Sequence, residues 1–233
     1  MVVCPNTHGM KQLTVYTMSN RMFITGCDKN CEWQLEWFLK NYRKHNNVPI
    51  AFCDFGVSTE MRLLALSLFD EVYQLPPQQY QGWFYKPRAL MNAPCEEKIW
   101  IDTDIEVLGD ISGAFDLIED NKLAMVEDKP WTKRRGETWH NSGFVGVRGT
   151  PVILRDWVKE CSTRAKQGDQ EVLHAMLGNN AILREKYITT LPNKYNWLRI
   201  QLLDGQDSPN KLCMHWTGQK GNYVIEKKIY NDQ

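Results

Sequence analysis

Short apolar runs alternate with segments of helical periodicity over the first hundred residues, and few folds accommodate this alternation. The apolar runs have the length and the β-branched or aromatic content of strands, and they lie at 13–17, 22–26, 49–55, 71–75 and 99–101. Helical spacing is found in 32–45, after Ser58, and from Pro87, which suits a first helical turn. Strands separated by helices pair in parallel, with helices on both faces of the sheet. We therefore expect an α/β fold with a mostly parallel central sheet.

Length and composition favour one domain of a soluble protein. A chain of 233 residues that is 42% hydrophobic can bury one sizeable core, and no composition shift marks a domain boundary. No apolar run approaches the roughly 18 residues of a membrane span, and residues 1–10 lack the apolar core of a signal peptide. We therefore expect a soluble, intracellular protein of the cytoplasm without a transmembrane segment.

Charge and cysteine usage argue against a nucleic-acid or membrane-binding surface and against a structural zinc site. The chain has 28 basic and 28 acidic residues, so its formal charge is zero and favours neither nucleic acid nor a membrane surface. The seven cysteines are scattered without a Cys-x-x-Cys pair. Reduced thiols are the simplest account of such spacing, and a structural zinc site is not expected.

The stretch KIWIDTDIEVLG (98–109) is an apolar strand that ends in two carboxylates, Asp102 and Asp104. In an extended chain, side chains two positions apart leave on the same side, so both carboxylates can converge on one point. Unpaired carboxylates there would repel each other, and a cation relieves this. Oxygen ligands suit Mg²⁺ or Mn²⁺. The alternative is two solvated aspartates in a turn; an EF-hand is excluded because Val107 occupies the position that needs glycine.

Acidic residues also follow two other expected strands. Asp28 lies after the run at 22–26, and Asp54 closes the run at 49–55. Ligands of parallel α/β sheets bind at the carboxyl ends of the strands. The coincidence with Asp102 and Asp104 supports a functional site at this edge.

Residues 127–140 (EDKPWTKRRGETWH) have no periodicity and contain four basic side chains, two tryptophans and one glycine. We predict a mobile loop over the site, although a solvated basic surface loop would have the same composition. The KPWTKRR segment could stack on and track a nucleic acid, but the zero net charge argues against that use.

Polar segments further along the chain supply more candidates. Asn141-Ser142-Gly143 opens an apolar strand at 144–147, and residues 191–196 (LPNKYN) form an expected loop. Asp169-Gln170 heads a helix, where Asp169 is either a plain N-cap or part of the site. His215 is followed by a Gly-x-Lys-Gly loop at 218–221, whose glycines and lysine suit phosphate beside a metal.

Together these segments resemble the GT-A-fold, metal-dependent glycosyltransferases, and most closely the glycogenin-like retaining group. The matching pieces stand in the family's order and cover most of residues 13–225. The resemblance implies a single GT-A (Rossmann-like) domain over 1–233. Its nucleotide-sugar half would span about 13–110, and its acceptor half and closing loop about 111–225.

The resemblance also implies roles at the metal and diphosphate. Asp102, Asp104 and His215 would bind Mn²⁺ or Mg²⁺, with Asp102 also near the ribose. Lys220 and Gly218 would hold the diphosphate of the donor.

Around the donor sugar, the resemblance implies contacts from Asn141 and Gly143, and from Asp169 and Gln170 as the catalytic pair. Lys86 resembles a donor-contacting basic residue. If Asp169 attacks the anomeric carbon, retention follows by double displacement; otherwise the acceptor arrives on the side of the leaving group. The residues alone leave both routes open.

The sequence departs from the family's motifs at two places. The family's closing motif normally runs on to Lys-Pro-Trp, whereas Lys220 is followed by Gly221-Asn222-Tyr223 here. Residues 25–30 also differ from the family's usual opening segment. These departures affect the phosphate contacts and the base specificity respectively.

The implied function is transfer of a hexosyl or pentosyl group from a nucleotide-sugar, a UDP-sugar by resemblance, to a glycan, lipid-linked or protein acceptor. The same chemistry on a modified nucleic-acid base is an alternative. A nucleotidyltransferase also uses paired carboxylates and a metal, but no Gly-rich phosphate loop is found at 13–30. A non-catalytic sugar-binding module could use the nine tryptophans, and it would bind without metal.

Overall fold

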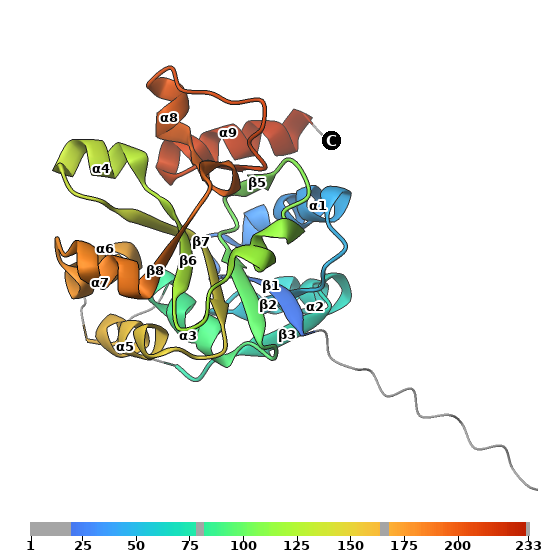
Figure 1. The fold of residues 1–233 in the computed structure, drawn as a ribbon. Helices are drawn as coiled ribbons and strands as arrows, with labels where there is room; N and C mark the ends of the chain where they lie inside the picture. Colours follow the sequence, from blue (N-terminus) through green and yellow to red (C-terminus); the bar gives the residue numbers. More distant parts are fainter. Residues whose placement is uncertain (1–19, 78–81, 164–167, 232–233) are drawn as a thin grey trace, which may run out of the picture.

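A computed structural model describes residues 20–77, 82–163 and 168–231. A seven-stranded sheet in the order β3-β2-β1-β4-β7-β6-β8 forms its centre (Figure 1). The strands are β1 (Arg21–Cys27), β2 (Ile50–Asp54), β3 (Glu71–Gln74), β4 (Glu97–Ile101), β6 (Leu123–Glu127), β7 (His140–Arg148) and β8 (Ile188–Leu191). The predicted strand at 13–17 lies outside the described residues.

The pairing is parallel except at one strand. β1 is parallel to β2 and β4, β2 to β3, and β6 to β8, whereas β7 is antiparallel to both β4 and β6. The predicted α/β class and mostly parallel sheet are confirmed. The reversal of β7 was not predicted, because periodicity carries no information on strand direction.

Helices lie on both sides of the sheet, with α1 and α2 on one side and α5 to α7 on the other in Figure 1. The α-helices are α1 (Leu35–His45), α2 (Thr59–Leu68), α3 (Lys86–Asn92), α4 (Lys129–Arg135), α5 (Val152–Cys161), α6 (Asp169–Leu177), α7 (Ala181–Tyr187), α8 (Arg199–Leu203) and α9 (Gly218–Asn231). The 3-10 helices are η1 (Glu32–Gln34), η2 (Gly82–Tyr85), η3 (Ser112–Leu117) and η4 (Asn193–Tyr195). Ser58 caps α2 as predicted, since its hydroxyl accepts from Met61 N at 3.2 Å.

The central strands are buried on both faces. In β1, Phe23 belongs to the apolar cluster under α1, while its neighbour Ile24 belongs to the cluster under α3 and α5. In β4, Ile99 and Ile101 face the first cluster and Trp100 faces the second. Continuous apolar runs rather than strict alternation are typical of strands covered by helices on both faces.

A second, three-stranded sheet crosses the carboxyl edge of the first. It is formed by β5 (Ile105–Val107), β10 (Cys213–His215) and β9 (Trp197–Leu198) in this order. β10 is antiparallel to β5, and His215 lies opposite Ile105. This pairing carries a residue from near the end of the chain back to the Asp-x-Asp segment.

Three expected loops contain helices. The segment 127–140 holds α4, whose N-cap Asp128 accepts from Trp131 N at 3.0 Å and whose C-cap Gly136 has a φ of 71°. A capping aspartate, Pro130 in the first turn and a closing glycine are helix signals, but the seven-residue helix is too short for its periodicity to be read. The expected loop at 191–196 contains η4, and the expected phosphate loop at 218–221 is the first turn of α9.

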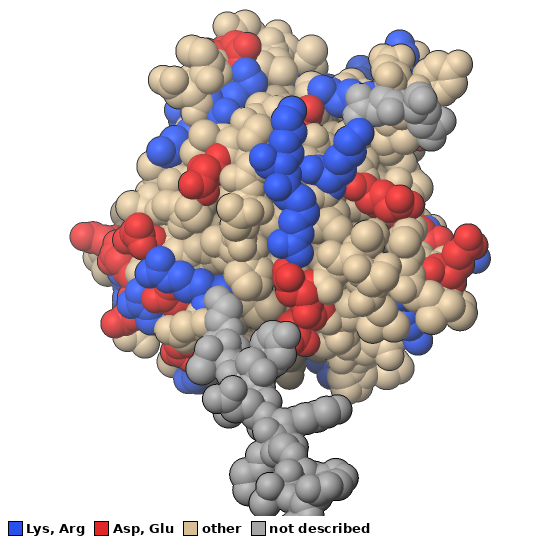
Figure 2. Space-filling model, turned by 90° about the vertical axis from the view of Figure 1, so that its right-hand side faces the viewer, with Lys and Arg blue, Asp and Glu red and all other residues tan. Residues whose placement is uncertain are grey.

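The surface carries both signs of charge. On the face in Figure 2, Lys and Arg side chains form a central column with acidic side chains around it. Among the described residues, no helix combines the length and the apolar character needed to cross a bilayer.

Candidate active site

The reversed strand β7 brings Asn141, Ser142 and Gly143 to the end of β4. Because the strands are antiparallel, Phe144 lies opposite Ile101, and Gly143 O accepts from Asp102 N at 2.9 Å. The first residues of β7 therefore flank the first carboxylate of the Asp-x-Asp segment.

The second sheet completes a cluster of three metal-ligand types. Asp102, Asp104 and His215 each offer a ligand atom, and these atoms lie within 4.8 Å of one another. His215 Nε2 is 3.1 Å from Asp104 Oδ1 and 3.9 Å from Asp102 Oδ2. Burial lowers the pKa of His215, but the carboxylates of Asp104 and Asp102 raise it by more, so that its net shift is upward. The structure thus brings the predicted metal ligands together.

A chain of buried amides determines the tautomer of His215. Gly143 N donates to Asn141 Oδ1 at 2.9 Å, so this atom is the amide oxygen, and Asn196 Nδ2 must be the atom that donates to it at 2.7 Å. Asn196 Oδ1 then faces His215 Nδ1 at 2.9 Å and accepts its proton. In neutral His215, Nε2 is left with a free lone pair toward the two carboxylates.

Gly143 leaves the space that His215 occupies. A Cβ built at Gly143 would overlap the imidazole Cε1 and would lie 2.7 Å from Nδ1, closer than side-chain carbons approach. The glycine in Asn-Ser-Gly is therefore required by the packing of the histidine ring against β7.

The donor set fits a divalent cation. Two carboxylates and one imidazole nitrogen are ligands that Mn²⁺ accepts, and two carboxylates are common for Mg²⁺. His215 Nδ1 donates to the side-chain oxygen of Asn196, and histidine metal ligands likewise donate their second N–H to an acceptor that fixes the ring.

Lys86 and Asp169 form a buried ion pair beside Asp102. Lys86 Nζ lies 2.9 Å from Asp102 Oδ1 and 3.3 Å from Asp169 Oδ2, and it donates to Ser142 O at 3.0 Å. Burial lowers the pKa of Lys86, and the two carboxylates more than offset this. Burial raises the pKa of Asp169, against the opposing effect of Lys86. Asp169 is the first helical residue of α6 with Gly168 at the N-cap, so the interpretation of Asp169 as a plain N-cap is wrong.

Gln170 is fixed by a second buried carboxylate, Asp128. Gln170 Oε1 accepts from Asn141 Nδ2 at 3.0 Å, and Gln170 Nε2 donates to Asp128 Oδ2 at 3.1 Å. Asn141 Nδ2 also donates to Asp128 Oδ2 at 3.1 Å. Sequence reasoning missed Asp128 and Asn196; the signal for Asp128 was its place directly after the apolar strand β6.

Two cavities meet at Trp83, Lys86 and Asp102. One, of about 390 Å³, is lined by polar residues of β7 and α6 and by His215: Asn141, Ser142, Gly143, Asp169, Gln170 and Glu171. The other, of about 490 Å³, is lined by Asp104 and by residues of the β1 end and α9: Gly26, Asp28, Gln34, Gly218, Gln219 and Asn222.

Two charged residues that the sequence suggested for the site, Asp54 and Lys220, lie apart from the Asp102, Asp104 and His215 cluster. Asp54 is engaged within the fold, since it pairs with Arg62 at 2.7 Å and accepts from Gln74 at 2.8 Å. Lys220 is exposed on the first turn of α9, next to Gln219 of the larger cavity.

Comparison with known proteins gives no match by sequence, since neither a protein-family model nor a curated protein matches the chain. Solved structures do match. Galactosyltransferase LgtC in complex with donor and acceptor sugar analogs is 12% identical with a TM-score of 0.59, over 90% of this chain and 94% of LgtC.

Two further matches are to longer chains. The apo form of the glycosyltransferase GlyE from Streptococcus pneumoniae TIGR4 is 15% identical with a TM-score of 0.64, over 92% of this chain and 64% of GlyE. The bifunctional glycosyltransferase WbbM is 14% identical with a TM-score of 0.56, over 95% of this chain and 53% of WbbM. The described chain therefore has the GT-A fold of these glycosyltransferases, as its sequence predicted.

Proposed function

We propose that this protein is a glycosyltransferase that moves a sugar from a nucleotide-sugar donor to an acceptor with the help of Mn²⁺ or Mg²⁺. The observation that carries the proposal is the convergence of Asp102, Asp104 and His215 where two cavities meet. Two adjoining cavities suit two substrates, and the similar LgtC structure holds donor and acceptor sugar analogs.

The metal ligands in this proposal are Asp102, Asp104 and His215 Nε2. When bound, a divalent cation acts there as a Lewis acid that neutralises charge on the departing diphosphate. Lys86 adds a fixed positive charge next to Asp102. Gly218 and Lys220 begin the 14-residue helix α9, and the N-terminal end of a helix favours an anion. We assign the diphosphate to this end of the larger cavity.

The donor sugar is assigned to the smaller cavity, beside Asn141, Gly143, Asp169 and Gln170. As the glycosidic bond breaks, the sugar gains oxocarbenium character that a carboxylate or amide oxygen stabilises. Gln170 Oε1 already accepts from Asn141 and Ser142, and its amide carries no charge. Asp169 is a carboxylate whose Oδ2 lies 3.3 Å from the ammonium of Lys86, which favours its ionised form, so Asp169 is the stronger nucleophile of the two.

Retention follows from this assignment. An oxygen of Asp169 attacks the anomeric carbon while the bond to the diphosphate breaks. An acceptor hydroxyl then displaces the carboxylate and gives its proton to the released diphosphate. Gln170 positions the sugar; a glutamine is also present in the active site of LgtC, where an active-site mutant replaces it with glutamate. We also propose that the donor is a UDP-sugar and that the protein is most similar to the glycogenin-like retaining group.

The test is a donor panel. The protein is incubated with Mn²⁺ and UDP-, GDP-, CMP- and dTDP-sugars without acceptor, and released nucleotide is measured. Slow release of one nucleotide, lost with chelator and restored with Mn²⁺, is the expected result. Absence of both release and metal-dependent binding for every donor would contradict the proposal.

A further inference from the structure

Helix α4 presents positive charge that the described chain does not neutralise. Lys129, Lys133, Arg134 and Arg135 are all exposed, and none of the first three has an ion-pair partner within the described ranges. The guanidinium of Arg135 lies over the ring of Trp131, 4.7 Å from its centroid.

The carboxylates that cap and follow the helix are engaged elsewhere. Asp128, the N-cap of α4, is buried and accepts from Asn141 and Gln170. Glu137, just after the helix, is 3.1 Å from His174 Nε2. Neither of these two carboxylates forms an ion pair with the cations of α4.

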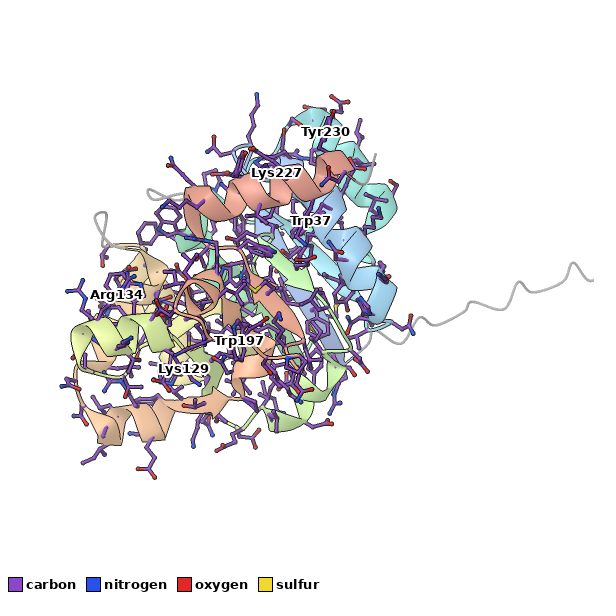
Figure 3. All side chains as sticks on the ribbon, turned by 90° about the horizontal axis from the view of Figure 1, so that it is seen from above. Trp37, Lys129, Arg134, Trp197, Lys227 and Tyr230 are labelled. Carbon is purple, nitrogen blue, oxygen red and sulfur yellow. The ribbon has the colours of Figure 1, made fainter. Side chains whose placement is uncertain are left out.

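This helix borders the cavity assigned to the donor sugar. Asp128 and Trp131 line the 390 Å³ cavity, and Leu198 and Ile200 line it from the segment around α8. Figure 1 shows α4 standing out from the sheet below α8, and Figure 3 shows Lys129 and Arg134 along it at the edge of the molecule. Arg134 and Arg135 follow Trp131 by about one helical turn and therefore lie on the same face of α4 as this cavity-lining residue.

An aromatic side chain lies at the same opening. Trp83 is 61% exposed although it lines both cavities. A large exposed indole at the rim of a polar cavity offers an apolar face on which the C–H face of a sugar ring can pack.

We propose that the acceptor is a saccharide that carries an anionic group, a phosphate or a carboxylate, which binds the cations of α4 while a sugar ring packs on Trp83. This inference rests on the proposed function and names its acceptor class. Arg and Lys are the usual partners of carboxylate and phosphate groups.

Size and charge favour a saccharide over a nucleic acid. The seven residues of α4 extend about 10 Å, enough for one or two anionic groups. Nucleic-acid-binding domains commonly have an isoelectric point above about 9, whereas that of this sequence is 6.9.

The test compares binding to matched saccharide pairs on an array, galacturonate against galactose oligosaccharides and phosphorylated against unphosphorylated mannosides, with a short oligothymidylate as the nucleic-acid probe. The test variant is Lys133→Glu/Arg134→Glu. The control is Lys44→Glu/Lys159→Glu, which makes the same change of net charge at two exposed lysines in the last turns of α1 and α5.

We expect wild type and control to bind at least one anionic saccharide about tenfold more tightly than its neutral counterpart, and the test variant to lose this preference. The phosphate and carboxylate pairs show which anion is bound. Trp83→Ala weakens the anionic and neutral members equally. High salt removes the preference of wild type.

Equal binding of charged and neutral saccharides, retention of the preference by the test variant, or selective binding of oligothymidylate would each overturn the inference. Acceptor-free donor hydrolysis by wild type is measured alongside. Donor hydrolysis without charge-selective binding overturns this inference alone, whereas the absence of both donor hydrolysis and metal-dependent donor binding overturns the proposed function.

Discussion

At the scale of single residues, the site depends on side chains that touch neither cavity. Asn196 is fully buried and links His215 to Asn141 by two hydrogen bonds of opposite direction. Its oxygen holds the imidazole in the tautomer that leaves Nε2 available, and its amide group holds Asn141 in the wall of the smaller cavity.

Replacing Asn196 should separate these two effects. Asn196→Leu removes both hydrogen bonds, and we expect Mn²⁺ affinity to fall about 10- to 100-fold. Asn196→Asp keeps an acceptor for His215 Nδ1 but cannot donate to Asn141, so it should retain more metal affinity than the leucine variant. Calorimetric Mn²⁺ titration and ¹⁵N NMR of the His215 tautomer measure both effects. The exposed Asn92→Leu is the control, and equal Mn²⁺ affinity in all four proteins would show that Asn196 has no positioning role.

Gly143→Ala tests the space needed by His215. The added Cβ must displace the imidazole, so we expect Mn²⁺ affinity to fall at least about tenfold. Gly113→Ala is the matched control, because its Cβ meets Tyr195 Oη at 3.5 Å, an ordinary contact. The readout is Mn²⁺ titration. Wild-type affinity in the alanine variant at Gly143 would mean that the ring can move without loss.

At the scale of elements, α9 is docked through a glycine. A Cβ at Gly221 would overlap the carbonyl oxygen of Trp216, which cannot move freely because Trp216 N donates to Asp104 O. Gly221, which stands where the resemblance would place the proline of Lys-Pro-Trp, is therefore the point of close approach between α9 and Trp216, the residue that follows β10.

Gly221→Ala should destabilise the protein by about 2 kcal/mol, the cost of overpacking a tight contact. Helix propensity alone would give the opposite sign, since alanine is favoured over glycine inside a helix by about 1 kcal/mol. Urea unfolding therefore distinguishes the two effects. Tyr223→Ala, at a 57%-exposed position of the same helix, serves as control and should change stability little. Stabilisation by Gly221→Ala would contradict the close packing of α9.

At the scale of the whole molecule, one buried histidine gives stability a pH dependence. Burial, with smaller contributions from Arg184 and His174, lowers the pKa of His140 from 6.5 to about 4. Its Nε2 lies 3.0 Å from Thr190 Oγ1, which links β7 to β8. Because the folded state holds His140 neutral, the unfolded state binds more protons below about pH 6.5, and stability falls with falling pH.

The free energy of unfolding should accordingly lose about 3 kcal/mol from His140 as pH falls from 6.5 to 4. His140→Asn should lack this part of the loss. Urea denaturation of wild type and His140→Asn from pH 6.5 to 4 gives the difference between their free energies of unfolding. The contributions of the other titrating groups are common to both proteins and cancel in this difference. Parallel stability curves for the two proteins would show that His140 is not held neutral.

The fold was predictable from local signals, because apolar runs between helical segments indicate the sheet. Asp102 and Asp104 were proposed as ligands from their spacing, and His215 as a third ligand from the resemblance; the structure brings these three side chains together. The direction of β7, the helix α4 and the positions of Asp128 and Asn196 were not predicted. These features depend on strand pairing and hydrogen bonds between residues far apart in the chain. The spacing of residues in the sequence does not indicate which distant residues will pair.

The central claim is that Asp102, Asp104 and His215 hold a metal that drives donor cleavage, and one measurement tests it most directly. Acceptor-free hydrolysis of the preferred nucleotide-sugar is followed with Mn²⁺ for wild type, Asp104→Asn and the control Asp156→Asn, an exposed aspartate of α5. Loss of a ligand charge should lower the rate at least about a hundredfold in Asp104→Asn, while its unfolding temperature and the control's rate stay unchanged. Full Mn²⁺-dependent activity of a folded Asp104→Asn would contradict the metal site.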